Sequence, residues 1–340
     1  MNLPIHPPFA PMEALLVDEI PIGEDWQYEP KWDGFRCLAF RDRNEVKLQS
    51  KSGQDLTRYF PELAEAFLNL RCDRFVLDGE IAVPIEGEFS FDELLQRIHP
   101  AVSRVQKLAR EHPAVYIAFD LLVSETGEDL LKRPLAERRK VLEKFSRNYM
   151  NEGEQIRLSP ATPDLKLAKN WFKTVGADLD GIVAKRADLP YQSGERTGMQ
   201  KIKNQRTADC VVGGFRYASN SKVIGSLLLG LYNEQGQLDH VGFCSGLKAE
   251  ERKQLKQTLE PLISPPGFTG RAPGGLSRWS TKRSMEWQPL RPKLVVEVSY
   301  DHFTGGRFRH GTRLLRWRPD KSPCQCRMDQ VRRRGSTLTC

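Results

Sequence analysis

The chain has no long apolar segment. Apolar residues make up 39% of its 340 residues, and no run approaches the roughly 20 apolar residues that a membrane-spanning helix needs. Residues 1–11 lack the basic stretch followed by an apolar core that marks a secretory signal. We therefore expect a cytoplasmic protein with no membrane association.

Cysteine is also scarce. The seven cysteines are an odd number without paired metal-ligand spacing, and Cys324 and Cys326 are too close together and too isolated for a zinc site. These features favour reduced thiols and exclude a disulfide-bonded scaffold. Internal repeats and low-complexity segments are missing as well, so a repeat architecture is not expected.

Basic residues exceed acidic residues, 52 against 44, which gives a net charge of +8. This excess is a mild form of the pattern expected for a protein that binds a polyanion. One basic group lies near the C-terminus: Arg307, Arg309, His310, Arg313, Arg316, Arg318 and Lys321. A second group, Arg327 and Arg332 to Arg334, is either a disordered solubilising tail or a phosphate-contacting segment.

The length predicts two domains, because single cores usually stop growing before 340 residues. For residues 1–204 we expect an α+β domain with antiparallel sheets and flanking helices. Its expected strands are a hairpin over 37–49 and the segments 75–83, 114–122, 181–185 and 199–203. Its expected helices are 61–70, 134–145 and 164–175, the last capped by Asp164.

The pattern changes after Ala208 to short apolar strands separated by glycines. Strands are expected at 210–215, 224–232, 238–244 and 294–300, with a helix at 249–262 and an exposed loop at 264–275. Several short strands with one inserted helix are typical of a small five-stranded barrel of the oligonucleotide-binding (OB) type. We assign residues 205–326 to this domain and 327–340 to a basic tail.

A lysine that could take part in catalysis lies in the segment KWDGFR, residues 31–36. Lys31 follows a proline and precedes an Asp-Gly turn signal, so we expect it on a constrained loop. A lysine attacks phosphorus only as the neutral amine, which makes Lys31 a candidate nucleophile if its surroundings favour deprotonation. Taken alone, such a lysine is more often a solvated loop residue.

Further charged residues lie inside apolar strands. Asp78, Glu80 and Asp120 interrupt such runs, and a buried carboxylate needs a cation, a metal or donors. Each is therefore either part of a site or half of a core salt bridge. Strand alternation places Lys201 and Lys203 on one face, where they could grip one phosphate or simply face solvent. Glu80 and Asp180 offer hard oxygen ligands to a divalent metal.

The order and spacing of these segments resemble the ATP-dependent DNA ligases, within the covalent nucleotidyltransferase superfamily. The segments are 29–36, 77–80, 119–120, 180–185, 201–203 and 313–321. The resemblance is to the bacterial LigC-type enzymes and the ligase module of LigD, over about residues 10–330. It implies an adenylation domain followed by an OB-fold domain.

The resemblance also implies roles for individual residues. Lys31 would be adenylated, Glu29 and Arg36 would line the adenosine pocket, and Phe119 would stack on adenine. Glu80 would bind ribose or metal, and Asp180 would help to hold metal. The phosphate contacts would come from Lys185, Lys201 and Lys203, and those to the β- and γ-phosphates from Arg318 and Lys321.

Two positions depart from the family pattern. Lys51 stands where the family usually has an arginine, so its ribose contact lacks bidentate hydrogen bonding. Asp180 stands where many relatives have glutamate, which shortens the reach to a metal. We also expect Arg196, Arg309 and Arg316 to contact DNA.

The implied reaction uses ATP and a divalent metal, Mg²⁺ or Mn²⁺, to seal nicks in double-stranded DNA through a lysyl-AMP and a DNA-adenylate. The implied protein is a nucleoid-associated monomer that acts in DNA repair, with other repair proteins as further partners. The alternatives are an RNA ligase or a guanylate-transferring capping enzyme, which share the lysine motif. A third alternative is a nucleic-acid-binding protein without catalytic activity.

Overall fold

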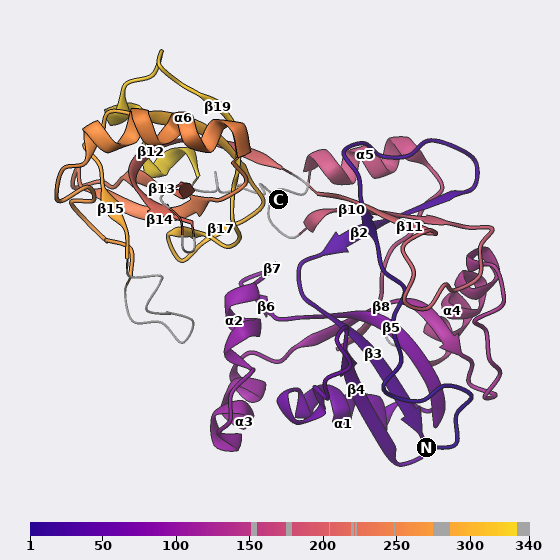
Figure 1. The fold of residues 1–340 in the computed structure, drawn as a ribbon. Coiled ribbons are helices and arrows are strands. Elements are labelled where there is room, and N and C mark those ends of the chain that lie inside the picture. Colours follow the sequence, from indigo (N-terminus) through magenta and orange to yellow (C-terminus); the bar gives the residue numbers. More distant parts are fainter. Residues whose placement is uncertain are drawn as a thin grey trace, which may run out of the picture. The chain divides into compact units, whose positions relative to one another are not determined.

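In a computed structural model, the protein divides into two compact units, Met1–Asn204 and Gln205–Cys340 (Figure 1). The structure describes residues 1–150, 155–174, 179–203, 205–218, 221, 223–247, 249–274 and 286–331. Within these ranges, no helix combines the length and the apolar character that a membrane span requires.

The first unit contains two sheets. One has the strand order β1-β11-β10-β2 and the other β4-β3-β5-β8-β9. The strands of the first sheet are β1 (Leu15–Leu16), β2 (Trp26–Trp32), β10 (Leu179–Arg186) and β11 (Met199–Lys203). Those of the second are β3 (Phe35–Asp42), β4 (Glu45–Ser50), β5 (Arg74–Ala82), β8 (Val115–Val123) and β9 (Ile156–Leu158), and β6 (Pro84–Ile85) and β7 (Glu88–Phe89) form a small hairpin.

Helices cover the outer faces of the two sheets. Those of the first unit are α1 (Pro61–Asn69), α2 (Phe91–Gln96), α3 (Val102–Glu111), α4 (Leu135–Tyr149) and α5 (Leu165–Thr174), with a 3-10 turn at Thr57–Tyr59. α1 begins at Pro61, where a missing N–H costs nothing. The Asp164 Oδ1 atom accepts a hydrogen bond from the Lys166 N–H at 2.7 Å, which confirms the expected cap of α5.

Two apolar clusters attach these helices to the sheets. Phe67 of α1 and Phe145 of α4 pack on Leu77 and Tyr116 of the second sheet. Trp171 of α5 packs with the buried side chains Tyr28, Ile182 and Ile202 of the first sheet. Each sheet is thus apolar on its helix-covered face. The other face of the second sheet also carries apolar residues, which pack with Met12 and Tyr191.

The second unit is a closed barrel. Its strands run in the order β14-β13-β12-β16-β19, and a bridge between Cys244 and Thr312 joins the ends of β14 and β19. The barrel strands are β12 (Arg206–Tyr217), β13 (Ile224–Tyr232), β14 (Leu238–Cys244), β16 (Val295–Tyr300) and β19 (Arg313–Trp317). Between β14 and β16 lies α6 (Ala249–Leu259), followed by a 3-10 turn at Glu260–Leu262. This order confirms the expected OB fold.

Short elements complete the barrel unit. β15 (Gln288–Pro289) pairs with β12, and β17 (Phe303–Thr304) pairs with β18 (Arg307–Phe308). Two 3-10 turns follow, at Pro323–Gln325 and Met328–Gln330. Together with α6, they frame a core that includes Leu227, Leu229, Val241 and Val298.

Three of the sequence-based expectations differ from the structure. Lys31 lies within β2, not on a loop, and only the following Asp33 and Gly34 leave the strand. The segment 264–274 is not wholly exposed, because Phe268 is buried in the barrel core. The barrel core also extends past residue 326, since Val331 packs into it. Residues 332–340 of the expected tail lie outside the described residues.

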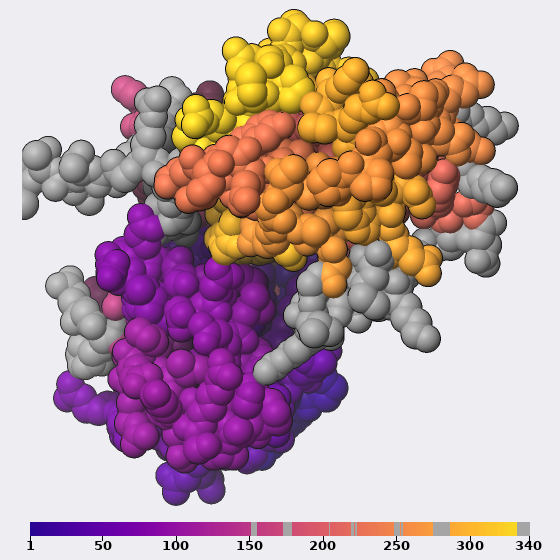
Figure 2. All heavy atoms as spheres, turned by 90° about the vertical axis from the view of Figure 1, so that its left-hand side faces the viewer, coloured from indigo at the N-terminus to yellow at the C-terminus, as the bar shows by residue number. Residues whose placement is uncertain are grey.

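Helices α2 and α3 were not expected from the sequence. They lie on the surface of the first unit, where Figure 2 shows them among the violet and magenta atoms that face the viewer (Figure 2). α3 buries only Val105 and Ala109. Val102, Val105, Leu108 and Ala109 nevertheless recur at helical spacing, so the pattern that predicts α3 is present in the sequence and was not recognised.

Three glycines of the motif segments are required by close backbone approaches. A Cβ atom on Gly34 would lie 2.2 Å from the Ile81 carbonyl oxygen, and one on Gly79 would lie 2.5 Å from the Tyr116 ring. At Gly181, φ is +143°, and a Cβ atom would lie 1.9 Å from the Ile202 carbonyl oxygen. Gly79 and Gly181 therefore lie inside strands and permit close strand packing instead of forming turns.

The Gly181→Ala substitution should destabilise the first unit by more than about 3 kcal/mol, because backbone strain adds to a backbone clash. Gly87 is a matched control, since its φ is +87° but nothing lies within 4 Å of its Cβ position. Gly87→Ala should cost only about 1 kcal/mol. Urea unfolding of both variants measures this difference, and equal losses would contradict the clash.

Candidate active site

A cavity of about 180 Å³ lies between the two sheets of the first unit. The β1-β11-β10-β2 sheet contributes Glu29, Lys31, Val183, Lys185, Met199 and Lys201. The second sheet contributes Arg36, Glu80 and Phe119, and Lys51 follows its strand β4. Eight predicted site residues therefore line one cavity: Glu29, Lys31, Arg36, Lys51, Glu80, Phe119, Lys185 and Lys201.

The strand register explains why the lysines gather. Lys31 and Lys203 pair with Gly181 from opposite sides, and Glu29 and Lys201 flank Val183 in the same way. Residues that are paired across strands or two apart along a strand share one face of a sheet. Burial lowers the pKa of Lys201, and the charges of Lys31, Lys51 and Lys203 lower it further. Cations thus outnumber carboxylates in the lining of the cavity.

Asp180 joins this face through an irregularity in β10. The register between β10 and β2 shifts between Leu179 and Gly181, and such a bulge can turn a side chain away from its regular direction. The Asp180 carboxylate forms an ion pair with the Lys31 ammonium group and lies 3.9 Å from Lys203 Nζ. The Lys31 side chain is 22% exposed and that of Asp180 only 7%, so the lysine keeps access to the cavity.

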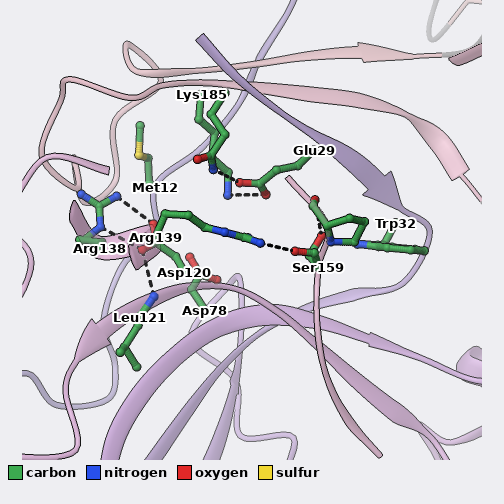
Figure 3. Close-up of polar contacts among 12 residues, drawn as sticks. Met12, Glu29, Trp32, Asp78, Asp120, Leu121, Arg138, Arg139, Ser159 and Lys185 are labelled. Carbon is green, nitrogen blue, oxygen red and sulfur yellow. Dashed lines mark hydrogen bonds and ion pairs between the residues drawn. The ribbon is translucent and has the colours of Figure 1, made fainter. Parts of the chain in front are cut away.

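Glu29 and Lys185 form a buried pair beside an aromatic ring. Lys185 Nζ lies 2.7 Å from Glu29 Oε2, and both side chains are at most 5% exposed (Figure 3). The same ammonium group lies 4.4 Å from the centroid of the Phe119 ring. A charge buried this deeply needs its partner, so Glu29 fixes Lys185 against the ring.

Two of the buried carboxylates serve as partners of arginines. Asp78 accepts two hydrogen bonds of 2.6 Å from Arg36. Asp120 accepts bonds of 2.9 and 2.8 Å from Arg138 (Figure 3). Burial by itself raises the pKa of Asp120, but the charge and hydrogen bonds of Arg138 outweigh this effect and lower it. For Asp78 and Asp120, the core salt bridge is therefore the correct alternative.

A hydrogen-bond chain fixes the end of β2 next to Lys31. The Trp32 indole N–H donates to the Ser159 hydroxyl at 3.0 Å, and Arg139 of α4 donates to the Ser159 carbonyl at 2.9 Å (Figure 3). These bonds tie the strand that carries Lys31 to helix α4. These bonds therefore fix the backbone position from which the Lys31 side chain projects into the cavity.

Glu80 has an unusual environment for a carboxylate. Burial raises its pKa to about 7, although the charges of Lys31 and Arg36 act in the opposite direction. No group of three or more His, Cys, Asp or Glu side chains within the described ranges could hold a metal by itself. Glu80 and Asp180 nevertheless supply two hard oxygen donors close to Lys31, and phosphate oxygens and water commonly complete the coordination of Mg²⁺.

The sequence did not identify the N-terminal segment that closes the cavity. Met12, Glu13 and Ala14 line it, but no secondary-structure signal marks them. Glu13 Oε1 lies 3.2 Å from Lys51 Nζ, and Glu13 Oε2 lies 2.7 Å from Arg196 Nη2. Lys51 is therefore held by a carboxylate, and Arg196, a predicted DNA contact, lies at the edge of this segment.

Four other predicted site residues belong to the second unit. Arg318 Nη1 and Lys321 Nζ lie 3.0 and 2.6 Å from the two oxygens of Asp209. Arg316 Nε lies 2.6 Å from Glu297 Oε2, and the Arg309 backbone N–H donates to the His302 carbonyl at 3.0 Å. The expected basic strand end therefore exists, and carboxylates of the barrel hold Arg316, Arg318 and Lys321.

Comparison with known proteins gives consistent matches over most of the chain. The profile described as "ATP dependent DNA ligase domain" matches residues 11–203, and "ATP dependent DNA ligase C terminal region" matches residues 220–321. DNA ligase C2 of Mycolicibacterium smegmatis is 44% identical over 347 residues, which cover 97% of this chain and 96% of that protein.

More distant matches agree with these. The multifunctional non-homologous end joining protein LigD of Pseudomonas aeruginosa is 31% identical over 87% of this chain and 34% of its own length. A solved structure from a study of Lig E DNA ligases is 14% identical, with a TM-score of 0.55 over 90% of this chain and 100% of that one. The latter is a likeness in fold alone.

The Glu80→Gln substitution should stabilise the protein more at pH 8 than at pH 5. Glu80 has a pKa of about 7 in the folded protein and an ordinary value of 4.5, so stability falls as the pH rises between these values. A glutamine does not ionise, and we expect a relative gain of about 1–3 kcal/mol at pH 8. Urea unfolding at both pH values tests this, and a pH-independent difference would refute it.

Proposed function

The chain belongs to the ATP-dependent DNA ligases, and from this premise we propose that Lys31 is the residue that becomes covalently adenylated. The observation that carries the proposal is the position of the Lys31 amine in a cavity lined by Lys185 and Lys201 of the same sheet face, with Lys203 on that face beside Asp180. Such a group of cations favours the binding of a triphosphate.

In the first step, the neutral Nζ atom of Lys31 forms a bond to the α-phosphorus of ATP, and the bond to pyrophosphate breaks. The Asp180 carboxylate orients the amine, and Lys201 and Lys203 offset charge on the phosphate. Phe119 provides a flat apolar surface for the adenine, with Lys185 held beside it by Glu29. Positioning and cation contacts supply most of the acceleration in phosphoryl transfer.

Glu80 and Asp180 are the residues that fit a divalent metal, Mg²⁺ or Mn²⁺. When bound, such an ion would neutralise phosphate charge and lower the proton affinity of the amine. Because Glu80 must ionise to bind a cation and has a pKa of about 7, ion binding by this chain should strengthen as the pH rises through neutrality.

In the later steps, AMP passes from Lys31 to the 5′-phosphate of a nick, and the adjacent 3′-OH then displaces AMP. We assign DNA contacts to Arg196, Arg309 and Arg316, and contacts to the β- and γ-phosphates of ATP to Arg318 and Lys321. The similarity to the non-homologous end joining protein LigD supports a role in DNA repair. We further propose that the protein acts as a monomer in the cytoplasm, at the nucleoid and with other repair proteins. RNA ligation and guanylate transfer receive no support from the similar proteins.

The Lys31→Ala variant should form no adenylyl adduct, because the substitution removes the nucleophile. Mass spectrometry of the purified protein after incubation with ATP and Mg²⁺ measures this, and peptide mapping locates the adduct. Lys47→Ala is the control, since Lys47 is an exposed residue of β4 that does not line the cavity. An adduct on the Lys31→Ala variant would place the nucleophile elsewhere.

The Lys321→Ala variant should slow self-adenylation by about 100-fold, the usual effect of removing one charge-stabilising donor. Sealing of nicked DNA by the pre-adenylated variant should be nearly unchanged, because pyrophosphate has already left. Lys293→Ala is the control, an exposed residue of the same unit. Single-turnover assays of both steps test the assignment, and equal losses in the two steps would remove Lys321 from the triphosphate site.

A further inference from the structure

Tyr191 is a buried residue in the loop between β10 and β11, with no role assigned by the proposed function. Its hydroxyl donates to Asp78 Oδ2 at 2.7 Å and accepts from the Met12 backbone N–H at 2.9 Å. Burial and the charge of Asp78 raise the pKa of Tyr191 well above its usual value. The hydroxyl therefore remains a donor at any physiological pH.

The hydrogen bond to Asp78 connects Tyr191, through Arg36, to the Phe119 ring on which adenine is proposed to stack. Asp78 is fully buried and accepts two hydrogen bonds of 2.6 Å from Arg36. The Arg36 guanidinium carbon lies 4.5 Å from the centroid of the Phe119 ring. Tyr191, Asp78, Arg36 and Phe119 thus form one continuous chain, and only its last two members line the cavity.

The hydrogen bond to Met12 connects Tyr191 to the N-terminal segment that forms another wall of the cavity. Met12, Glu13 and Ala14 line the cavity, and the loop that carries Tyr191 holds this segment at several points. The Ser193 hydroxyl donates to the Ala10 carbonyl at 2.7 Å, and the Glu13 N–H donates to the Glu195 carbonyl at 2.8 Å. The Arg36 Nη2 atom also lies 3.4 Å from the Met12 carbonyl oxygen. One hydroxyl group therefore joins two walls of the cavity.

We infer that Tyr191 is a positioning residue for nucleotide binding, which orients the Phe119 ring through Asp78 and Arg36 and sets its separation from the Met12–Ala14 wall. This inference rests on the proposed function. It concerns the base-binding part of the cavity, because the chain ends at the aromatic ring. Lys185 lies 4.4 Å from the centroid of the same ring, but Glu29, and not this chain, holds it.

The test is the Tyr191→Phe variant, which removes only the hydroxyl. In self-adenylation, its KM for ATP should rise about fivefold, the usual effect of losing one hydrogen bond, with little change in kcat. Inhibition by inorganic tripolyphosphate should stay as in the wild type, because this anion has no base to stack. Tyr28→Phe is the control, since Tyr28 is equally buried and its hydroxyl donates only to the Pro21 carbonyl, at 2.8 Å.

A double-mutant cycle shows whether Tyr191 acts through the ring. In a Phe119→Leu background, Tyr191→Phe should raise KM no further, because coupled positions are not additive. The inference is overturned if Tyr191→Phe leaves the KM for ATP unchanged, if it weakens tripolyphosphate binding equally, or if Tyr28→Phe has the same effect. Failure of the wild-type protein to form an adduct, or labelling of the Lys31→Ala variant, would instead contradict the proposed function.

Discussion

Repulsion between like charges is the constraint around which the first unit is built. Lys31, Lys185, Lys201 and Lys203 project from one face of a single sheet, where alternation leaves them no other direction. Glu29 pairs with Lys185, and Asp180 lies beside both Lys31 and Lys203. Four ammonium groups thus face two carboxylates on the three strands β2, β10 and β11. Such a surface is most stable with a polyanion bound, so ligand binding and the internal electrostatics favour each other.

The buried carboxylates of this unit divide into two kinds. Asp78 and Asp120 accept paired hydrogen bonds from arginines and so make the second sheet rigid. Asp180 and Glu80 lie next to mobile ammonium groups or an open cavity and can exchange partners. The first kind fixes the shape of the cavity, and the second kind responds to what enters it. The arginine-paired carboxylates thus form a rigid support for a cavity whose own carboxylates can change partners when a ligand binds.

Period-two alternation and composition were sufficient to predict most of the strands, including β5, β8, β10 and β11, the OB barrel and the shared face of Lys201 and Lys203. The turn signal at Asp33 and Gly34 led to the wrong placement of Lys31, because a turn can follow a strand immediately. The position of Asp180 depends on a bulge that no sequence pattern marks. Met12 and Tyr191 meet over a long separation through a single hydroxyl, and neither belongs to a periodic segment. Contacts of this kind arise only from the tertiary fold.

Alternation also limits how the length of this chain can change during evolution. Inserting one residue in β11 before Lys201 would turn Lys201 and Lys203 toward α5 and bring apolar side chains into the cavity. An insertion in β10 would do the same to Lys185. Length variation among descendants of this sequence should therefore collect in the β6–β7 hairpin and similar turns, where Gly87 has open space around it. Residues of the catalytic strands can be substituted, but the register of these strands cannot shift.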